Sequence, residues 1–205
     1  YETTRRLLER FGPDNSVLLI GPAGERQLHS ASIQCSDPDQ RPCRAAGRGG
    51  MGAVMGSKGL KAIVIDRKGG QRAELAHTEA FKQAAKAYAK NLREFPVTGK
   101  VLKKFGTTSN VDAINAAGSF ASFNAREGRL PGYQQINGQS LHDTIKARGG
   151  QVGHMGCTGC VIRCSNVYLD QGGKYLTSSL EYETIWAFGG MCGLTELDAI
   201  ARLDY

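Results

Sequence analysis

The first third of the chain contains short apolar runs that predict β-strands. Residues 16–20 (SVLLI) and residues 61–66 (KAIVID) are two such runs, and the first is followed by a turn rich in Gly and Pro. Residues 3–11 have the pattern of the end of a helix, and a glycine-rich loop lies between the two predicted strands. The pattern therefore predicts a β-rich segment that extends to about residue 66.

After Gly69 and Gly70 the pattern becomes helical. Residues 78–93 are rich in Ala, Lys and Glu and repeat apolar side chains at the spacing of one helical face. Residues 118–138 contain several Gly and few periodic apolar positions, which predicts an ordered loop. A hairpin is predicted at residues 167–176, and further helices at residues 97–104, 111–116, 141–147, 181–188 and 196–205. We therefore expect an α+β fold with a domain boundary near residues 69–70.

The composition limits the classes of protein to which the chain can belong. With 205 residues, of which 40% are hydrophobic, it can bury one substantial core or two small ones. No apolar run approaches the roughly 20 residues that cross a bilayer. The net charge is +7, but the basic residues are spread from Arg5 to Arg202 and usually stand beside acids. We therefore interpret them as a solvated surface rather than a nucleic-acid site.

Six cysteines are present, and three of them fall within eight residues. The spacing C-x-x-C-x-x-x-C at Cys157, Cys160 and Cys164 lets three thiolates converge on one centre, because the chain wraps a tight turn and returns one helical turn later. This pattern favours metal ligation in a reducing cytoplasm over a secreted disulfide framework. A [4Fe–4S] cluster needs a fourth ligand, and the candidates are a Cys outside this chain, Cys35, Cys43 and Cys192.

Two other interpretations of the cysteine cluster stay open. Zinc also binds Cys together with His, and His154 lies three residues before Cys157, although no second C-x-x-C or H-x-x-x-H pair is present. A group of buried thiols without a metal is the other alternative. Haem attachment is not predicted, because it requires C-x-x-C-H. We favour iron and sulfur, since thiolates match the charge and softness of iron.

Residues 47–52 (GRGGMG) satisfy the dinucleotide-binding pattern G-x-G-x-x-G. A Rossmann turn follows a strand and opens a helix, whereas residues 37–43 are not strand-like and the later glycines are expected to interrupt a helix. Nicotinamide binding is therefore not expected. What remains is a loop whose backbone N–H groups can approach a phosphate, with Arg48 and Lys58 as cationic partners. A tight structural crossover explains the same glycines equally well.

Residues 47–66 (GRGGMGAVMGSKGLKAIVID) are similar almost throughout to the signature that closes the N-terminal domain of aldehyde:ferredoxin oxidoreductases. Segments that resemble this family follow in its order, namely Gly106-Thr107-Thr108, Phe123-Asn124-Ala125-Arg126, the cysteine cluster, Glu181-Tyr182-Glu183-Thr184 and Thr195-Glu196-Leu197-Asp198. The chain thus resembles an internal fragment, which agrees with the missing initiator Met and with a last helix that lacks a terminating residue.

The resemblance implies two domain parts. Residues 1–69 are expected to be the C-terminal part of a β-rich, pterin-binding N-terminal domain. Residues 70–205 are expected to begin a mainly α-helical domain that carries the iron–sulfur ligands. In the family the fourth cluster ligand comes from a later domain that is not in this chain.

The resemblance also implies the cofactors. Two pterins bind tungsten or molybdenum, and a [4Fe–4S] cluster nearby passes electrons to ferredoxin or another iron–sulfur acceptor. Arg48, Gly49, Gly50 and Met51 match the loop that meets the pterin phosphates, and the Gly49 carbonyl matches one that helps to hold a bridging Mg²⁺. The cysteine cluster matches three ligands of the [4Fe–4S] cluster. A cytoplasmic, anaerobic enzyme is expected.

The implied activity is oxidation of a small aldehyde, or another oxo donor, to a carboxylate. The family places a carboxylate near the metal at the position of Glu181 or Glu183, and only one of them can face it, because they point about 200° apart on a helix. Both can instead stabilise the first turn of a helix. The alternatives are a family member that reduces aromatic-ring thioesters, a zinc-stabilised binding module and a nicotinamide reductase. We expect no nucleic-acid or membrane partner, and we expect the fragment to be inactive by itself. The sequence is compatible with a homo-oligomer.

Overall fold

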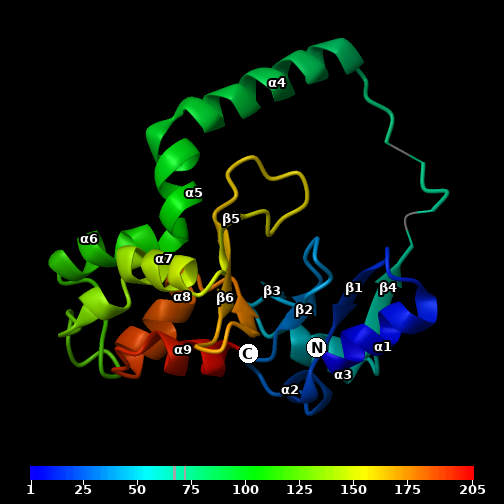
Figure 1. The fold of residues 1–205 in the computed structure, drawn as a ribbon. Helices are drawn as coiled ribbons and strands as arrows, with labels where there is room; N and C mark the ends of the chain where they lie inside the picture. The colour runs from blue at the N-terminus through cyan, green and yellow to red at the C-terminus, as the bar shows by residue number, and fades with distance from the viewer. Residues whose placement is uncertain (67, 72) are drawn as a thin grey trace. The chain divides into compact units, whose positions relative to one another are not determined.

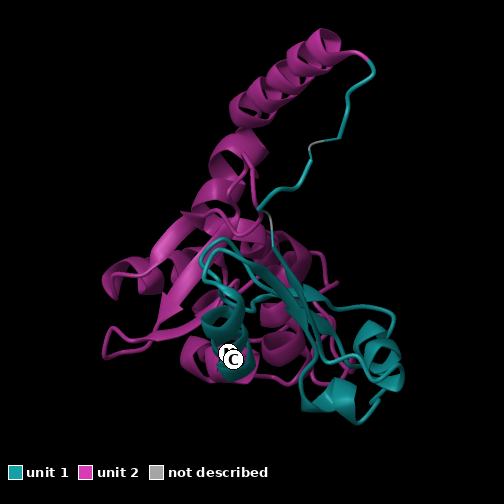
Figure 2. Cartoon of the chain, turned by 90° about the vertical axis from the view of Figure 1, so that its right-hand side faces the viewer, with its two compact units in different colours: residues 1–76 teal, residues 77–205 magenta. Residues whose placement is uncertain are grey.

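The computed structural model describes residues 1–66, 68–71 and 73–205 and divides into two compact units, Tyr1–Ala76 (unit 1) and His77–Tyr205 (unit 2) (Figure 1, Figure 2). Each unit combines helices with an antiparallel sheet, which confirms the predicted α+β class. None of the described helices is both long enough and apolar enough to cross a membrane.

Unit 1 is built on an antiparallel sheet. Its elements are α1 Glu2–Phe11, β1 Ser16–Leu19, α2 Pro22–Glu25, β2 Ile33–Cys35, β3 Arg44–Ala46, α3 Met51–Ser57 and β4 Ala62–Ile65. The strand order is β3-β2-β1-β4, and β1 pairs with β4 from Ser16 opposite Ile65 to Leu19 opposite Ala62. Val17 and Leu19 alternate with more exposed neighbours along β1, as expected for a strand with one buried face.

Unit 2 places helices around a second antiparallel sheet of order β5-β6-β7. The strands are β5 Gln151–His154, β6 Ser165–Leu169 and β7 Tyr175–Ser178. The helical elements are α4 Thr78–Glu94, the π-helix η1 Val97–Val101, α5 Leu102–Phe105, the 3-10 helix η2 Gly106–Asn110, α6 Val111–Ala116, the 3-10 helix η3 Tyr133–Gln135, α7 Gly138–Ala147, α8 Tyr182–Thr184, the π-helix η4 Ile185–Met191 and α9 Leu197–Asp204. Both views show α4 projecting from the other elements of this unit (Figure 1, Figure 2).

The core of unit 2 contains side chains from helices, strands and the segment between α6 and α7. Helix α7 contributes Leu141 and Ile145, which lie four positions apart on one face. Phe120 comes from the segment that the sequence predicts as an ordered loop, and Tyr168 comes from β6. All four side chains are almost completely buried. The loop is therefore part of the core rather than a surface strap.

A largely buried ion pair joins α9 to the end of α7, and a hydroxyl group on β6 also bonds to it. Arg148 donates a hydrogen bond to Asp198 Oδ2 at 3.1 Å, and the Tyr168 hydroxyl donates to Oδ1 at 2.7 Å. The hydrogen bond from Arg148 lowers the pKa of Asp198 to about 2, with Tyr168 and Gln171 acting in the same direction. Asp198 is thus held as a carboxylate at the edge of the core.

Most helices lie where the apolar pattern predicts them. α6 has the predicted bounds, and α4 ends one residue later than predicted. The predicted helices at residues 97–104 and 181–188 are both divided between α-helix and π-helix. The predicted hairpin is confirmed as β6 and β7. The strands β2, β3 and β5 are not predicted, because their short sequences, IQC, RAA and QVGH, contain no run of apolar side chains.

Candidate functional site

The three clustered cysteines lie on one loop of unit 2, residues 155–164, which connects β5 to β6 and is called the cysteine loop below. The Cys160 N–H donates a hydrogen bond to the Cys157 carbonyl at 3.1 Å, which closes a tight turn. Arg163 has a φ of 57°, and this left-handed residue turns the chain from Cys164 into β6. All three thiols are reduced; Cys157 is exposed, and Cys160 and Cys164 are half-buried. The loop therefore presents three accessible sulfur atoms.

The thiols of the cysteine loop are close enough to affect protonation. Burial raises the pKa of Cys164, and the Glu181 carboxylate, Cys160 and Cys157 raise it further. Three thiolates beside a carboxylate repel one another, so their charged form requires a cation in the same place. An iron–sulfur cluster or a zinc ion supplies such a cation, since both bind thiolates. The donor set of the loop thus fits a metal centre.

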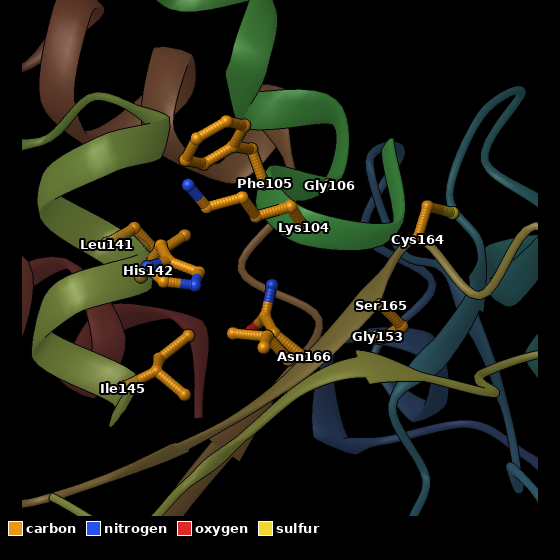
Figure 3. A pocket seen from close by; sticks show the side chains of 11 residues that line it. Lys104, Phe105, Gly106, Leu141, His142, Ile145, Gly153, Cys164, Ser165 and Asn166 are labelled. Atoms are coloured by element: carbon orange, nitrogen blue, oxygen red, sulfur yellow. The ribbon is translucent and has the colours of Figure 1, made fainter. Parts of the chain in front are cut away.

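The backbone of Gly106 lies close against the cysteine loop. It is buried with a φ of 64°, and a Cβ atom there would lie 2.7 Å from the Cys164 carbonyl oxygen. A cavity of about 10 Å³ lies beside it, which is room for one water molecule. In Figure 3 the Cys164 side chain points away from Lys104, His142 and Asn166, which line the other side of this cavity. The cavity is too small for a substrate, and the thiol faces away from it.

Two hydroxyl groups hold the carboxylate of Glu181. Thr107 Oγ1 donates to Oε2 at 2.7 Å, and Ser179 Oγ donates to Oε1 at 2.9 Å. The same Thr107 oxygen accepts a hydrogen bond from the Tyr182 N–H at 2.8 Å, which fixes the start of α8. We call Thr107 and Ser179 the hydroxyl clamp. The clamp leaves the carboxylate in one orientation. A Cβ atom at Gly106 would lie 3.9 Å from Glu181 Oε2 and 2.7 Å from the Cys164 carbonyl oxygen, so this carboxylate lies near the cysteine loop.

Glu183 has different surroundings, although it is only two residues away. Its side chain is exposed, and no hydrogen bond or ion pair to it occurs within the described residues 1–66, 68–71 and 73–205. Glu181 is the N-cap residue of α8, but its side chain makes no capping hydrogen bond. Glu183 lies in the first turn of α8, so a favourable interaction of these acids with the helix N-terminus stays open for both, while the Glu181 carboxylate also bonds to the hydroxyl clamp.

The glycine loop, residues 47–51, joins β3 to α3 in unit 1. Gly49 has a φ of 76°, and a Cβ atom there would have no neighbour within 4 Å. Arg48 and Gly49 are exposed. In the part of the chain that the structure describes, no group accepts a hydrogen bond from the N–H groups of Arg48, Gly49 or Gly50. The loop thus offers consecutive backbone donors and one guanidinium, which fit an anion such as a phosphate.

Other glycines of the same segment serve packing. A Cβ atom at Gly52 would lie 2.5 Å from the Ser32 carbonyl oxygen, and one at Gly56 would overlap the Gly24 carbonyl oxygen. Only glycine lets α3 approach these backbones so closely. Both predicted interpretations therefore apply, but to different residues: Gly49 is open to a ligand, and the glycines inside α3 form the crossover.

The topology around the glycine loop excludes a Rossmann site. The loop follows a strand, Arg44–Ala46, and opens a helix, Met51–Ser57, so the expectation that it lacks this context is wrong. The sheet is antiparallel, however, and β3 and β4 lie at its two edges, so these elements form no parallel βαβ unit. Lys58 follows the last residue of α3, about 10 Å along the helix from the loop, so Arg48 is the nearer of the two predicted cations.

The remaining cysteines have the surroundings of ordinary thiols. The Cys43 thiol donates a hydrogen bond to Asp37 Oδ2 at 3.3 Å, and burial followed by the Asp37 charge raises the pKa of Cys43 to about 12. Burial also raises the pKa of Cys35. Cys192 follows η4, so the ten helical residues of α8 and η4 separate it from Glu181. These positions give no support to a fourth cluster ligand from within the chain.

The hydroxyl clamp has no signature in the sequence. Thr107 lies in a segment that resembles the family, but a lone Thr has no pattern that predicts its partner. Ser179 is one of the residues with a positive φ, 71°, which the sequence does not indicate either. The one feature of the sequence that indicates Thr107 is the glycine before it. Gly106 has no side chain, which permits its close contact with Cys164 and brings the next residue, Thr107, to the same place.

Family models match both units of the chain. A model described as aldehyde ferredoxin oxidoreductase, N-terminal domain, matches residues 1–67, and one described as aldehyde ferredoxin oxidoreductase, domains 2 & 3, matches residues 83–205. Curated relatives include tungsten-containing aldehyde ferredoxin oxidoreductases of Pyrococcus horikoshii, at 35% identity, and Pyrococcus abyssi, at 34%. Each match covers 100% of this chain and 32% of the relative, so the chain spans about a third of their length.

A solved structure shares the fold. It is the active site complex BamBC of benzoyl coenzyme A reductase in complex with 1,5-dienoyl-CoA, with a TM-score of 0.70 and 23% sequence identity. The match covers 98% of this chain and 30% of the other. The fold is therefore common to proteins that differ widely in sequence.

Proposed function

This chain belongs to the aldehyde ferredoxin oxidoreductase family, and on that premise we propose that it carries the pterin-phosphate loop and three [4Fe–4S] ligands of a tungsten enzyme that oxidises aldehydes. The names of the relatives favour tungsten, rather than molybdenum, as the metal. They also favour ferredoxin as the electron acceptor. The two family matches support a division in which residues 1–69 end the N-terminal domain and residues 70–205 begin the helical one.

We assign the cluster ligands to Cys157, Cys160 and Cys164, with a fourth ligand from a part of the enzyme outside these residues. Three free thiols lie on one loop, and burial, the Glu181 carboxylate and the other two thiols raise the pKa of Cys164, so a bound cation would stabilise the thiolates. The same argument admits zinc, which is therefore the outcome that the test below must exclude.

We assign the phosphates of the pterins to the glycine loop. Arg48 supplies a guanidinium, and the N–H groups at Gly49 and Gly50 point to no acceptor within the described residues. The Gly49 carbonyl is exposed with its residue and is the group we propose for the bridging Mg²⁺, which prefers oxygen ligands. Met51 begins α3 and its side chain is exposed beside the loop.

Of the two candidate carboxylates, we propose that Glu181 acts in the reaction and Glu183 does not. A general acid or base must be held in a defined position, and the hydroxyl clamp holds both oxygens of Glu181. Glu183 has no such support. This clamped carboxylate beside the cysteine loop is the single observation that most favours a catalytic site over a structural metal site.

Oxidation of an aldehyde by water to a carboxylate releases two electrons and three protons. The bound metal–pterin centre and its cluster would supply the electron acceptor. Glu181 would accept one of the protons from the water or the hydrated aldehyde, and the clamp would keep its carboxylate oriented toward that proton. The clamp hydroxyls are neutral, so they orient the charge without removing it.

The decisive test is elemental analysis combined with an electron paramagnetic resonance spectrum of the full-length protein purified without air. Tungsten with a reducible cubane cluster is expected. Zinc as the only metal, with no paramagnetic signal after reduction, would make the cysteine loop a zinc-stabilised module and overturn the proposal.

Assays with aldehydes and with an aromatic-ring thioester then separate the two substrate classes. An aldehyde is expected, because the aldehyde ferredoxin oxidoreductases are more similar in sequence to this chain than the benzoyl coenzyme A reductase structure is.

A further inference from the structure

Three exposed lysines lie on one face of the helical segment before Gly106. Lys100 is in η1, and Lys103 and Lys104 are in α5, three and four positions further along. Residues at this spacing share a face of a continuous helical run, and like charges there destabilise the helix. We call these three residues the lysine face. Its repulsion is unfavourable for the isolated chain and would be relieved by an anionic partner.

The lysine face adjoins the strand that leads into the cysteine loop. A Cβ atom at Gly153 in β5 would lie 3.2 Å from the Lys103 carbonyl oxygen and 3.4 Å from its Cγ, so the stem of Lys103 lies along that strand. In Figure 1 the loop between β5 and β6 lies beside α5, in agreement with this contact. The loop itself carries another exposed cation, Arg163, next to Cys164. Lys103 and Arg163 therefore place two cations next to the proposed cluster site.

Local acids neutralise little of this charge. The Lys104 ammonium lies 4.5 Å from the ring centre of Phe105 and interacts with the Asp143 carboxylate. For Lys100, Lys103 and Arg163, no ion pair is present in the described parts of the chain. Most other basic residues of the chain stand beside acids in the sequence, so this concentration next to the cysteine loop is a local feature.

We infer that the lysine face and Arg163 form the docking surface for an acidic, one-electron carrier protein. The inference rests on the proposed function, because it requires a redox cluster in the cysteine loop. Each encounter transfers one electron: the reduced cluster is oxidised and the bound carrier is reduced, so two carriers are reduced for each aldehyde. Opposite charges steer such partners together and increase their rate of association. Cys157 is exposed, so a cluster on the cysteine loop would lie close to the surface that the carrier contacts.

The test uses the full-length holoenzyme with the double variant Lys100→Glu/Lys103→Glu. Two electron acceptors are compared, an acidic ferredoxin and a small uncharged redox dye. With ferredoxin, kcat/KM should fall about tenfold or more at low ionic strength, and the difference should shrink as salt is added. With the dye, kcat should be unchanged. Lys174→Glu is the matched control, since this exposed lysine lies in the β6–β7 turn, at the opposite end of the sheet from the cysteine loop.

Equal loss with Lys174→Glu, or an unchanged ferredoxin rate in the double variant, would overturn the docking surface. Equilibrium binding of oxidised ferredoxin to the oxidised enzyme gives a second readout without turnover, and the double variant should weaken it about tenfold at low salt. If the double variant also loses activity with the dye, the binding measurement decides whether the lysine face binds ferredoxin: unweakened binding would overturn the docking surface. A wild-type enzyme that oxidises no aldehyde with either acceptor contradicts the proposed function instead, while the binding experiment still tests the surface.

Discussion

The glycine loop of unit 1 and the cysteine loop of unit 2 both leave a short strand and contain left-handed residues, but they offer a ligand different atoms. The glycine loop presents backbone N–H groups, and its position depends on the close packing of α3 through Gly52 and Gly56. The cysteine loop presents sulfur atoms, and its neighbours are the Gly106 backbone and the hydroxyl-clamped Glu181. A change in the first loop should therefore affect folding and binding together, whereas the second can lose its ligand atoms and remain folded.

The largest expected effect is the loss of the cluster in Cys160→Ser. Removal of one thiolate ligand from the cysteine loop should abolish the paramagnetic signal of the reduced cluster and the transfer of electrons to ferredoxin. The thiol is half-buried, so the circular dichroism spectrum should be unchanged. Cys43→Ser is the control, because a hydroxyl can also donate to Asp37. Full iron content in the Cys160 variant would show that the loop is not the cluster site.

The next largest effect is expected for Glu181→Gln, which should reduce kcat about 10²–10⁴-fold at an unchanged cluster signal. Glu183→Gln should leave kcat near that of the wild type, since this side chain is exposed. Thr107→Val should reduce kcat about tenfold or more, because the Glu181 carboxylate loses one of its two hydroxyl partners. Thr107→Ser should keep most of the wild-type kcat, because serine retains the hydroxyl group. A greater loss for Glu183→Gln than for Glu181→Gln would reverse our choice between the two.

A smaller effect separates two glycines of unit 1. In Gly56→Ala the added methyl group overlaps the Gly24 carbonyl oxygen, so the free energy of unfolding should fall by about 3 kcal/mol. In Gly49→Ala the methyl group meets no atom, and only the left-handed backbone is disfavoured, by about 1–2 kcal/mol. Denaturant unfolding of both variants measures the difference. Equal losses would contradict the division between packed and open glycines.

The smallest effect concerns acid and should appear in unit 2. The folded-state pKa of Asp198 is about 2, below its ordinary value of 3.8, so the ion pair stabilises the fold above pH 4 and the contribution is lost as the pH falls toward 2. The loss should amount to about 2 kcal/mol. Unfolding measured across this pH range should show the slope in the wild type and a flatter profile in Asp198→Asn. An identical slope in both would assign the acid sensitivity to other carboxyl groups.

The two loops also differ in how far the sequence predicts them. Cysteine side chains carry their chemistry in the residue type, so Cys157, Cys160 and Cys164 can be selected from spacing alone. A glycine carries no such chemistry. Whether Gly49 is open and Gly56 packed depends on where the segment around Gly24 lies, which no local pattern indicates. The strand before the glycine loop is missed for a related reason, because its three residues gain their conformation from pairing with β2.

The long helices follow the apolar pattern because each buries one face, as α7 does with Leu141 and Ile145. The π-helices are not predicted, since one extra residue per turn leaves the local composition unchanged. The segment that contains Glu181 and Glu183 can be selected from its resemblance to the family. The choice of Glu181 rather than Glu183 as the proposed catalytic residue depends on the hydrogen-bond partners that the structure shows. One of these, Thr107, lies 74 residues away in the sequence.

This separation sets an order of events during folding. The hydrogen bond between Thr107 and Glu181 closes a segment of 74 residues, whereas the turn from Cys157 to Cys160 and the helix α7 need only neighbouring residues. Closing a long segment costs more conformational entropy and is slower than forming a local turn. The thiols can therefore gather on their loop before the carboxylate arrives beside them. In a chain that is still folding, three of the four proposed cluster ligands should accordingly be in place before the proposed catalytic carboxylate is.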